Sequence, residues 1–398
     1  MVQSRLRWDL LSSTFARGSR WRARSPLLFQ ALALAAAIAL AVNGWSIGTE
    51  ETAAARLVLR KTNLTTLAVW GLWWPLMILL AITLGRVWCT ACPLELACRA
   101  GGAAARHVGW RRLVLPRFMR SGWAVFLAYL VLQVLVAAAS IHRVPHFTSI
   151  FLALLGGLAL VSGLIFAAPH AFCRGLCPAR ALLSVYGRCT PRAGVRRNRE
   201  LRPFEAAFVV AAAGFVTHEL VGEVAWLENL FHVVPEAVHR QWPALAAEWL
   251  EVIWFLAVFP TALWALVAAV ARTFGNRGGL KATLLSTATG AAPVIALGHA
   301  AKAMSKLGAW AGYLPLALQD PNGIETLHKI SSGALSAPVP LVGLSMPGLL
   351  TAAAVVLVGW RSWRWARATV PGQLPALRAG FLVAAVFYTS IMVVWMEA

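Results

Sequence analysis

Charge is scarce in this chain, and negative charge is scarcest. Asp and Glu number 15 among 398 residues against 36 Lys and Arg, and only 13% of residues are charged. Hydrophobic residues make up 59%, and the mean hydropathy is +0.69. A water-soluble fold of this length needs more polar surface, so the composition excludes a soluble globular protein and indicates an integral membrane protein.

The motifs of several soluble enzyme classes are also absent. No Walker loop, dinucleotide fingerprint or nucleophile elbow occurs. A net charge of +21 would suggest nucleic acid, but the basic residues lie in short segments between apolar runs. The positive-inside rule explains that distribution, so we expect membrane lipid rather than nucleic acid as the partner of this charge.

Long apolar runs predict an all-α, polytopic transmembrane bundle of about nine helices with a cytoplasmic N-terminus. We expect these helices at residues 28–47, 64–87, 122–141, 148–168, 204–221, 250–271, 282–303, 345–360 and 379–396. A basic leader (1–27) precedes a core of two hairpins (28–203) and a C-terminal helical region (204–398). The acidic segment 222–249 predicts an amphipathic helix on the outer surface, and 304–344 predicts an outer loop.

The cysteines are few and confined to two short segments. All six lie between residues 89 and 189, and none follows. Cys89-Thr90-Ala91-Cys92-Pro93 follows the first predicted hairpin, and Cys173-Arg174-Gly175-Leu176-Cys177-Pro178 follows the second. Hairpin, motif and basic tail therefore occur twice, which is a weak internal repeat. Both motifs are expected at the cytoplasmic edge of the membrane.

Four thiols in a reducing compartment favour metal binding over disulfides. Cys-x3-Cys-Pro matches the end of the bacterial ferredoxin motif, and four cysteines are the usual ligand set of a [4Fe-4S] cluster. We therefore predict one such cluster on Cys89, Cys92, Cys173 and Cys177, with nearby arginines stabilising the thiolates. A structural zinc ion and free, redox-active thiols are the alternatives.

The other two cysteines are less informative. Cys98 and Cys189 each follow a motif, and they are either spare ligands or small apolar residues on a helix. We favour the second interpretation. A c-type haem would need a histidine directly after the second cysteine, and proline stands there in both motifs.

The motif segments resemble a known family. Gly85-Arg86-Val87-Trp88-Cys89, Cys92-Pro93-Leu94, Phe172-Cys173 and Cys177-Pro178 look like the NapH and NosR type of membrane-bound iron–sulfur protein. That resemblance covers about residues 64–200 and implies electron transfer between the quinone pool and periplasmic respiratory enzymes. In this chain the first motif is one residue shorter, and the ferredoxin-like cysteines that commonly follow the second motif are missing.

Histidines in the C-terminal half offer a second candidate site. His218 and His299 are predicted near the outer ends of their helices, at similar depth. They would ligate a b-type haem, flank a quinone headgroup or pack as ordinary core histidines, and we favour packing. Gly156-Gly157 and the Gly and Ala steps of 282–303 predict close helix packing.

These features favour a non-catalytic electron-transfer subunit in the bacterial cytoplasmic membrane. One cluster cannot carry charge across the membrane alone, so we expect a hetero-oligomeric complex with a periplasmic haem or copper redox protein, and exchange with quinol. The alternatives are an assembly or structural protein with a four-cysteine zinc site, and a transporter built on the repeated hairpins. The scarcity of intramembrane charge disfavours the transporter.

Overall fold

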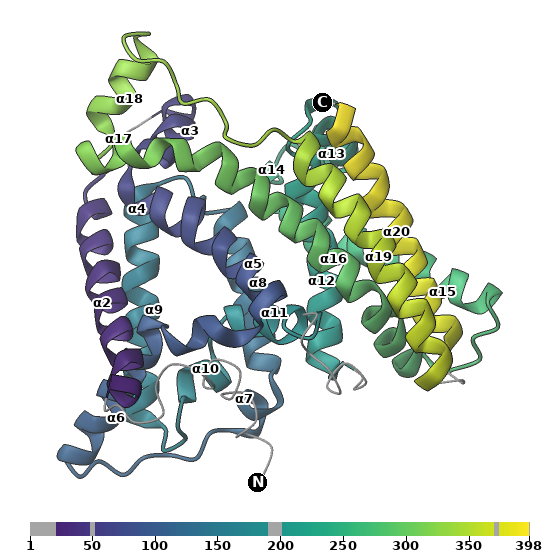
Figure 1. Ribbon diagram of the computed structural model, residues 1–398, viewed down its shortest axis with the longest axis horizontal. Coiled ribbons are helices and arrows are strands. Elements are labelled where there is room, and N and C mark those ends of the chain that lie inside the picture. Colours follow the sequence, from purple (N-terminus) through teal and green to yellow (C-terminus); the bar gives the residue numbers. More distant parts are fainter. Residues whose placement is uncertain (1–20, 48–51, 190–200, 370–373, 398) are drawn as a thin grey trace.

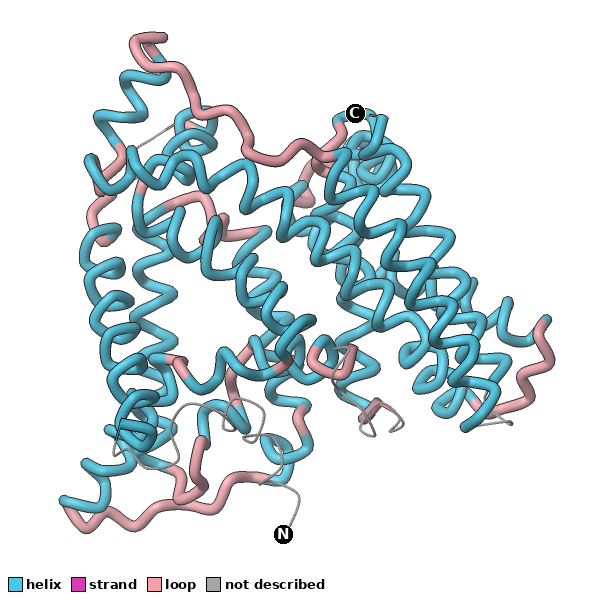
Figure 2. Tube along the Cα trace, in the orientation of Figure 1, coloured by secondary structure: helices cyan, strands magenta, loops and turns pink. Residues whose placement is uncertain are grey.

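Helices make up the regular structure of the described chain, which confirms the all-α prediction. The computed structural model describes residues 21–47, 52–189, 201–369 and 374–397. Within these ranges the secondary structure is helix and turn, and extended pairing is limited to one isolated bridge between Leu113 and Phe166 (Figure 2). Most of the predicted leader (1–27) and the basic segment 190–200 lie outside the described residues.

The helices follow one another with short connections (Figure 1). The first half contains α2 (Trp21–Gly44), α3 (Ala53–Thr62), α4 (Leu64–Thr66), η1 (Leu67–Trp73), α5 (Trp74–Leu84), η2 (Arg86–Thr90), α6 (Pro93–His107), α7 (Arg117–Ser121), α8 (Trp123–Ala137), α9 (Pro145–Ile165), α10 (Ala171–Gly175) and α11 (Ala179–Tyr186). The second half contains α12 (Pro203–Val221), α13 (Ala225–Gln241), α14 (Ala247–Ile253), η4 (Trp254–Val258), α15 (Phe259–Thr273), α16 (Leu280–Trp310), η5 (Ala311–Tyr313), α17 (Leu314–Gln319), α18 (Ile324–Ser331), α19 (Ser345–Thr369) and α20 (Leu374–Glu397).

Within the described ranges, seven helical segments are long and apolar enough to cross a membrane, as in a multi-pass membrane protein. They are Pro26–Gly44, Leu64–Leu84, Pro145–Ile165, Pro203–Val221, Ala247–Thr273, Leu280–Gln319 and Leu374–Glu397. The predicted spans 122–141 and 345–360 correspond to the shorter apolar helices Trp123–Ala137 and Ser345–Val358. Fifteen residues of helix rise only about 22 Å, less than the hydrocarbon core of about 30 Å.

Two of the spans contain a π-helical segment that ends two residues before a proline. η1 precedes Pro75, and η4 precedes Pro260. Proline has no N–H to donate to the carbonyl four residues earlier, so the turn before it widens instead of closing as α-helix. The prolines therefore explain why these two spans are not regular helices.

Glycines bring three pairs of helical segments into backbone contact. A Cβ on Gly163 of α9 would lie 1.9 Å from the carbonyl oxygen of Cys98 in α6. A Cβ on Gly214 of α12 would lie 1.8 Å from the carbonyl oxygen of Phe255 in η4. A Cβ on Gly290 of α16 would lie 2.1 Å from the carbonyl oxygen of Leu377 in α20. Membrane helices pack closely where such small residues face each other. These contacts fix α6 against α9 and η4 against α12.

The two cysteine motifs lie toward one end of the molecule. Segments α6, α10 and α11 gather at the lower end in Figure 1, whereas α3, α13 and α18 lie at the upper end. The range 304–344, predicted as an outer loop, holds the end of α16 together with η5, α17 and α18. α13 follows α12 as the helix predicted within 222–249.

Candidate metal centre at the cysteine motifs

The first motif begins where α5 ends. Gly85 adopts φ 72° and ψ −128°, a conformation that favours glycine, and turns the chain into η2, which carries Cys89. Cys92 then adopts an extended conformation as the N-cap of α6, and Pro93 occupies the first turn of that helix. The side chain of Gln30 in α2 donates a hydrogen bond of 3.0 Å to the carbonyl of Thr90, between the two cysteines.

The second motif is arranged like the first, but other helices and turns carry it. α9 ends at Ile165, and His170 adopts a left-handed conformation with φ 57° before the short helix α10, which carries Cys173. Cys177 and Pro178 then lead into α11. In both motifs the first cysteine lies on a short helix and the second immediately precedes a longer one.

The second cysteine of each motif lies at the start of a helix. The backbone N–H groups of Leu94 and Glu95 act to lower the pKa of Cys92. Those of Ala179 and Arg180 act in the same way on Cys177. Both sulfurs thus lie near the N-terminal end of a helix, a place that favours negative charge.

The two motifs lie against each other. Cys177 is within electrostatic range of both Cys89 and Cys92, and Cys173 is within range of Cys92. A Cβ on Gly187, just after α11, would lie 3.5 Å from the Cα of Gly85 at the start of the first motif. The four predicted ligands therefore come from separate hairpins to one region of the molecule.

Three of the four motif thiols are hard to ionise. Burial raises the pKa of Cys92 to about 11 and that of Cys177 to about 12, and it also raises the pKa of Cys173. The charges of the neighbouring cysteines raise these pKa values further. Burial lowers the pKa of Arg180, and the charges of neighbouring arginines lower it further. Desolvation and thiolate repulsion thus dominate the pKa values of these three thiols.

Glu95 is a buried carboxylate at the centre of the site, with only 3% of its surface exposed. It accepts a hydrogen bond of 2.9 Å from Arg99 Nε and lies 2.5 Å from Nδ1 of His170. The Cys173 thiol donates to its other oxygen at 3.5 Å. A carboxylate from the helix of the first motif therefore positions two residues of the second.

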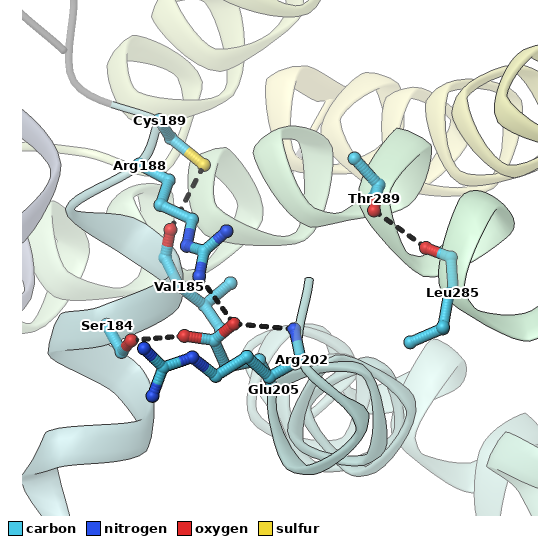
Figure 3. Close-up of polar contacts among 8 residues, drawn as sticks. All are labelled: Ser184, Val185, Arg188, Cys189, Arg202, Glu205, Leu285 and Thr289. Atoms are coloured by element: carbon cyan, nitrogen blue, oxygen red, sulfur yellow. Dashed lines mark hydrogen bonds and ion pairs between the residues drawn. The ribbon is translucent and has the colours of Figure 1, made fainter. Parts of the chain in front are cut away.

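Cys98 and Cys189 have different surroundings from the four motif cysteines. Cys98 is buried in the contact between α6 and α9. The Cys189 thiol donates to the carbonyl of Val185 at 3.7 Å (Figure 3). That both are packed residues rather than spare ligands stays our interpretation.

A second buried carboxylate joins the helix after the second motif to the next membrane span. Glu205 in α12 accepts 2.5 Å from Ser184 and 2.6 Å from Arg188 at the end of α11, as Figure 3 shows. It also accepts 2.8 Å from the backbone N–H of Arg202, which caps α12. This clamp holds α11, and with it Cys177, against the start of α12.

Tryptophan rings form a row that begins beside the first motif. Trp88, the residue before Cys89, lies edge-on to Trp73 at 5.8 Å between ring centroids. Trp73 lies 6.1 Å from Trp74, which lies 6.2 Å from Trp70. We call these four side chains the indole row. It runs from the motif into the first-half core.

The two histidines proposed for haem or quinone have separate partners. His299 is 1% exposed, and its Nδ1 lies 2.9 Å from the Tyr186 hydroxyl while its Nε2 lies 3.5 Å from Glu219. His218 stacks on Phe255 and faces His232 and Glu251. Lys302, which follows His299, pairs with Glu223. A shared haem or quinone at His218 and His299 stays a prediction.

Sequence reasoning did not single out Glu95, Glu205 or Gln30. A signal for the two glutamates was present, because each stands two residues after a proline at a helix start, Pro93-Leu94-Glu95 and Pro203-Phe204-Glu205. Proline at the first helical position and glutamate at the third are a capping pattern. Gln30 has no such signal, because its role depends on how α2 packs.

No protein-family model, curated protein or solved structure matches this chain.

Proposed function

We propose that this chain is a membrane-integral electron-transfer protein that holds one [4Fe-4S] cluster with Cys89, Cys92, Cys173 and Cys177. The observation that carries the proposal is the approach of two Cys-Pro turns from separate hairpins, with Cys177 in electrostatic range of both cysteines of the first motif. Four cysteine thiolates are the usual ligand set of such a cluster. When bound, the cluster supplies one-electron oxidation and reduction.

We favour a cluster over a single zinc ion because Cys-x3-Cys-Pro of the second motif matches the end of the bacterial ferredoxin motif. Tetrahedral zinc at about 2.3 Å from each sulfur would draw the sulfurs to about 3.8 Å from one another. Within the described residues, no three cysteine sulfurs lie within 4.8 Å of one another, so the thiols are not preset for zinc.

The protonation of the site disfavours free reactive thiols. A redox-active cysteine needs a low pKa and access to solvent, whereas burial raises the pKa of both Cys92 and Cys177. Such buried thiols ionise when a metal replaces their protons. The N–H groups of Leu94, Glu95, Ala179 and Arg180 would face two of the bound sulfurs, and hydrogen bonds to cluster sulfurs raise the reduction potential of a cluster.

The proposed setting is the bacterial cytoplasmic membrane, with about nine helices, a cytoplasmic N-terminus and the cysteine motifs on the cytoplasmic side. The arginines of α6, α7 and α11 at that end support this orientation. Quinol and a periplasmic haem or copper protein are the proposed electron-transfer partners. The resemblance to NapH and NosR proteins gives the same partners.

Analysis of the anaerobically purified full-length protein tests the proposal. We expect a brown protein with about four irons and matching acid-labile sulfide per chain, whose visible absorbance bleaches with dithionite. A colourless protein with one stoichiometric zinc would instead support the assembly or structural function. A split haem absorption band would support a haem at His218 and His299.

A further inference from the structure

Three ionisable side chains from three helices meet at the end of the bundle opposite the cysteine motifs. His218 comes from α12, His232 from α13 and Glu251 from α14. One ligating atom of each lies within 4.8 Å of the other two. In the part of the chain that the structure describes, this is the one group of three such His, Cys, Asp or Glu atoms. We call it the His–His–Glu cluster.

The separations in the His–His–Glu cluster match ligands of one ion better than hydrogen bonds. Glu251 Oε1 lies 3.4 Å from Nε2 of His218 and 3.5 Å from Nε2 of His232. Among the described residues, no acceptor or donor meets His232 Nε2 with hydrogen-bond geometry. Two ligands at about 2.0–2.1 Å from a tetrahedral ion lie about 3.4 Å apart. The distance from each of these nitrogens to the Glu251 oxygen is thus close to the distance between two ligands of one ion.

Local structure fixes this geometry. The backbone contact of Gly214 with Phe255 holds η4 against α12, and the Phe255 ring stacks on His218 at 4.7 Å with 8° between the planes. Glu251 lies one turn before Phe255, so the same contact brings its carboxylate to the imidazole. The π-helical η4 follows directly, and π-helical turns are frequent at functional sites.

The His–His–Glu cluster is also open to an incoming ion. The side chains of His218, His232 and Glu251 are 26%, 14% and 37% exposed. Glu219, Glu228 and Glu236 add negative charge around the imidazoles, whereas Lys302 and Arg143 add positive charge. The acidic neighbours outnumber the basic ones, which favours a cation.

We propose that His218, His232 and Glu251 bind a divalent first-row transition ion. Two imidazoles and one carboxylate match zinc best, and three protein ligands leave one coordination position open. This site is separate from the cysteine motifs and does not depend on the proposed iron–sulfur function.

Cobalt is a suitable probe because Co²⁺ occupies such sites and absorbs visible light. Purified full-length protein is incubated with Co²⁺ and desalted, and bound cobalt and iron are measured together. We expect His232→Ala and Glu251→Gln each to lose about one cobalt per chain relative to the unsubstituted protein. Cobalt bound by the cysteines is recognised by its intense thiolate charge-transfer absorption, which imidazole and carboxylate ligands do not give.

Matched controls lie on the same two helices. His239→Ala on α13 and Glu248→Gln on α14 change the same residue types outside the His–His–Glu cluster, and we expect both to keep the cobalt. Equal cobalt content in all four variants would overturn the proposal. If His232→Ala and Glu251→Gln fail to fold, one equivalent of Cu²⁺ is added to the unsubstituted protein instead. Electron paramagnetic resonance should then show coupling to two imidazole nitrogens, and its absence overturns the proposal.

Discussion

The two cysteine motifs share a plan and differ in what supports them. Each places its second cysteine at the start of a helix, where two backbone N–H groups act to lower the pKa of the thiol. The first motif is held by Gln30 and Trp88, whereas the second is held by Glu95 through His170 and Cys173. Because Glu95 belongs to the helix of the first motif, the second motif depends on the first. The two motifs that repeat in sequence are therefore supported by different residues in the structure.

The largest expected effect is on the shared ligand set. If both motifs hold one centre, Cys177→Ala should remove essentially all bound iron, and Cys89→Ala should do the same, because a cluster held by three cysteines is lost. Iron and sulfide are measured in the anaerobically purified protein. Cys98→Ala is the matched control and should keep its iron. Iron loss in Cys98→Ala would show that the four ligands are assigned wrongly.

A smaller effect is expected where α6 meets α9. Gly163→Leu forces a side chain into the backbone of Cys98 and should destabilise the protein by about 3 kcal/mol. The free energy of unfolding is measured by titration with dodecyl sulfate in mixed micelles. Gly156→Leu on the same helix meets no described atom within 4 Å and should be neutral or stabilising by up to about 1 kcal/mol. Equal losses in both variants would contradict this contact.

The smallest effect concerns the link between the motifs. Glu95→Gln removes the charge that Arg99 and His170 share and should cost about 2 kcal/mol of unfolding free energy. Glu325→Gln makes the same change in the exposed pair with Lys329 and should cost much less, because solvent screens that pair. The same titration compares the two variants. A loss in Glu95→Gln no greater than in Glu325→Gln would mean that the motifs are independent.

The long apolar runs were sufficient to predict the spans. The predicted ranges 64–87, 148–168 and 204–221 agree with Leu64–Leu84, Pro145–Ile165 and Pro203–Val221 to within a few residues. Hydrophobic length is a local property, so it can be read from the sequence. The range 122–141 did not reach the length of a span because α8 ends at Ala137, before the turn that leads to α9.

Helix contacts were harder to predict than helices. Gly156-Gly157 was predicted as a close-packing step, and that prediction was wrong, since no described atom approaches either position. In 282–303, Gly290 meets the backbone of Leu377 and Gly298 meets the ring of Tyr388, which confirms the prediction for that helix. A glycine permits close approach, but the partner that uses it comes from a distant part of the chain.

The residues of the candidate site also differ in whether a local pattern or helix packing determines their position. The spacing of the cysteines predicted the four candidate ligands, because ligand spacing is local, and their binding of one centre stays a prediction. Glu95, Gln30 and the His–His–Glu cluster depend on how separate helices pack. Burial depth is a property of the assembled fold, and it outweighed the charge pattern at Cys92 and Cys177.

The indole row has an optical consequence. Trp88 adjoins Cys89, and successive rings from Trp88 through Trp73 and Trp74 to Trp70 lie about 6 Å apart. Excited indoles at such separations exchange energy faster than they emit. An absorbing centre beside Cys89 would therefore quench the fluorescence of the whole row, and the native chain reports on its own loading without an added label.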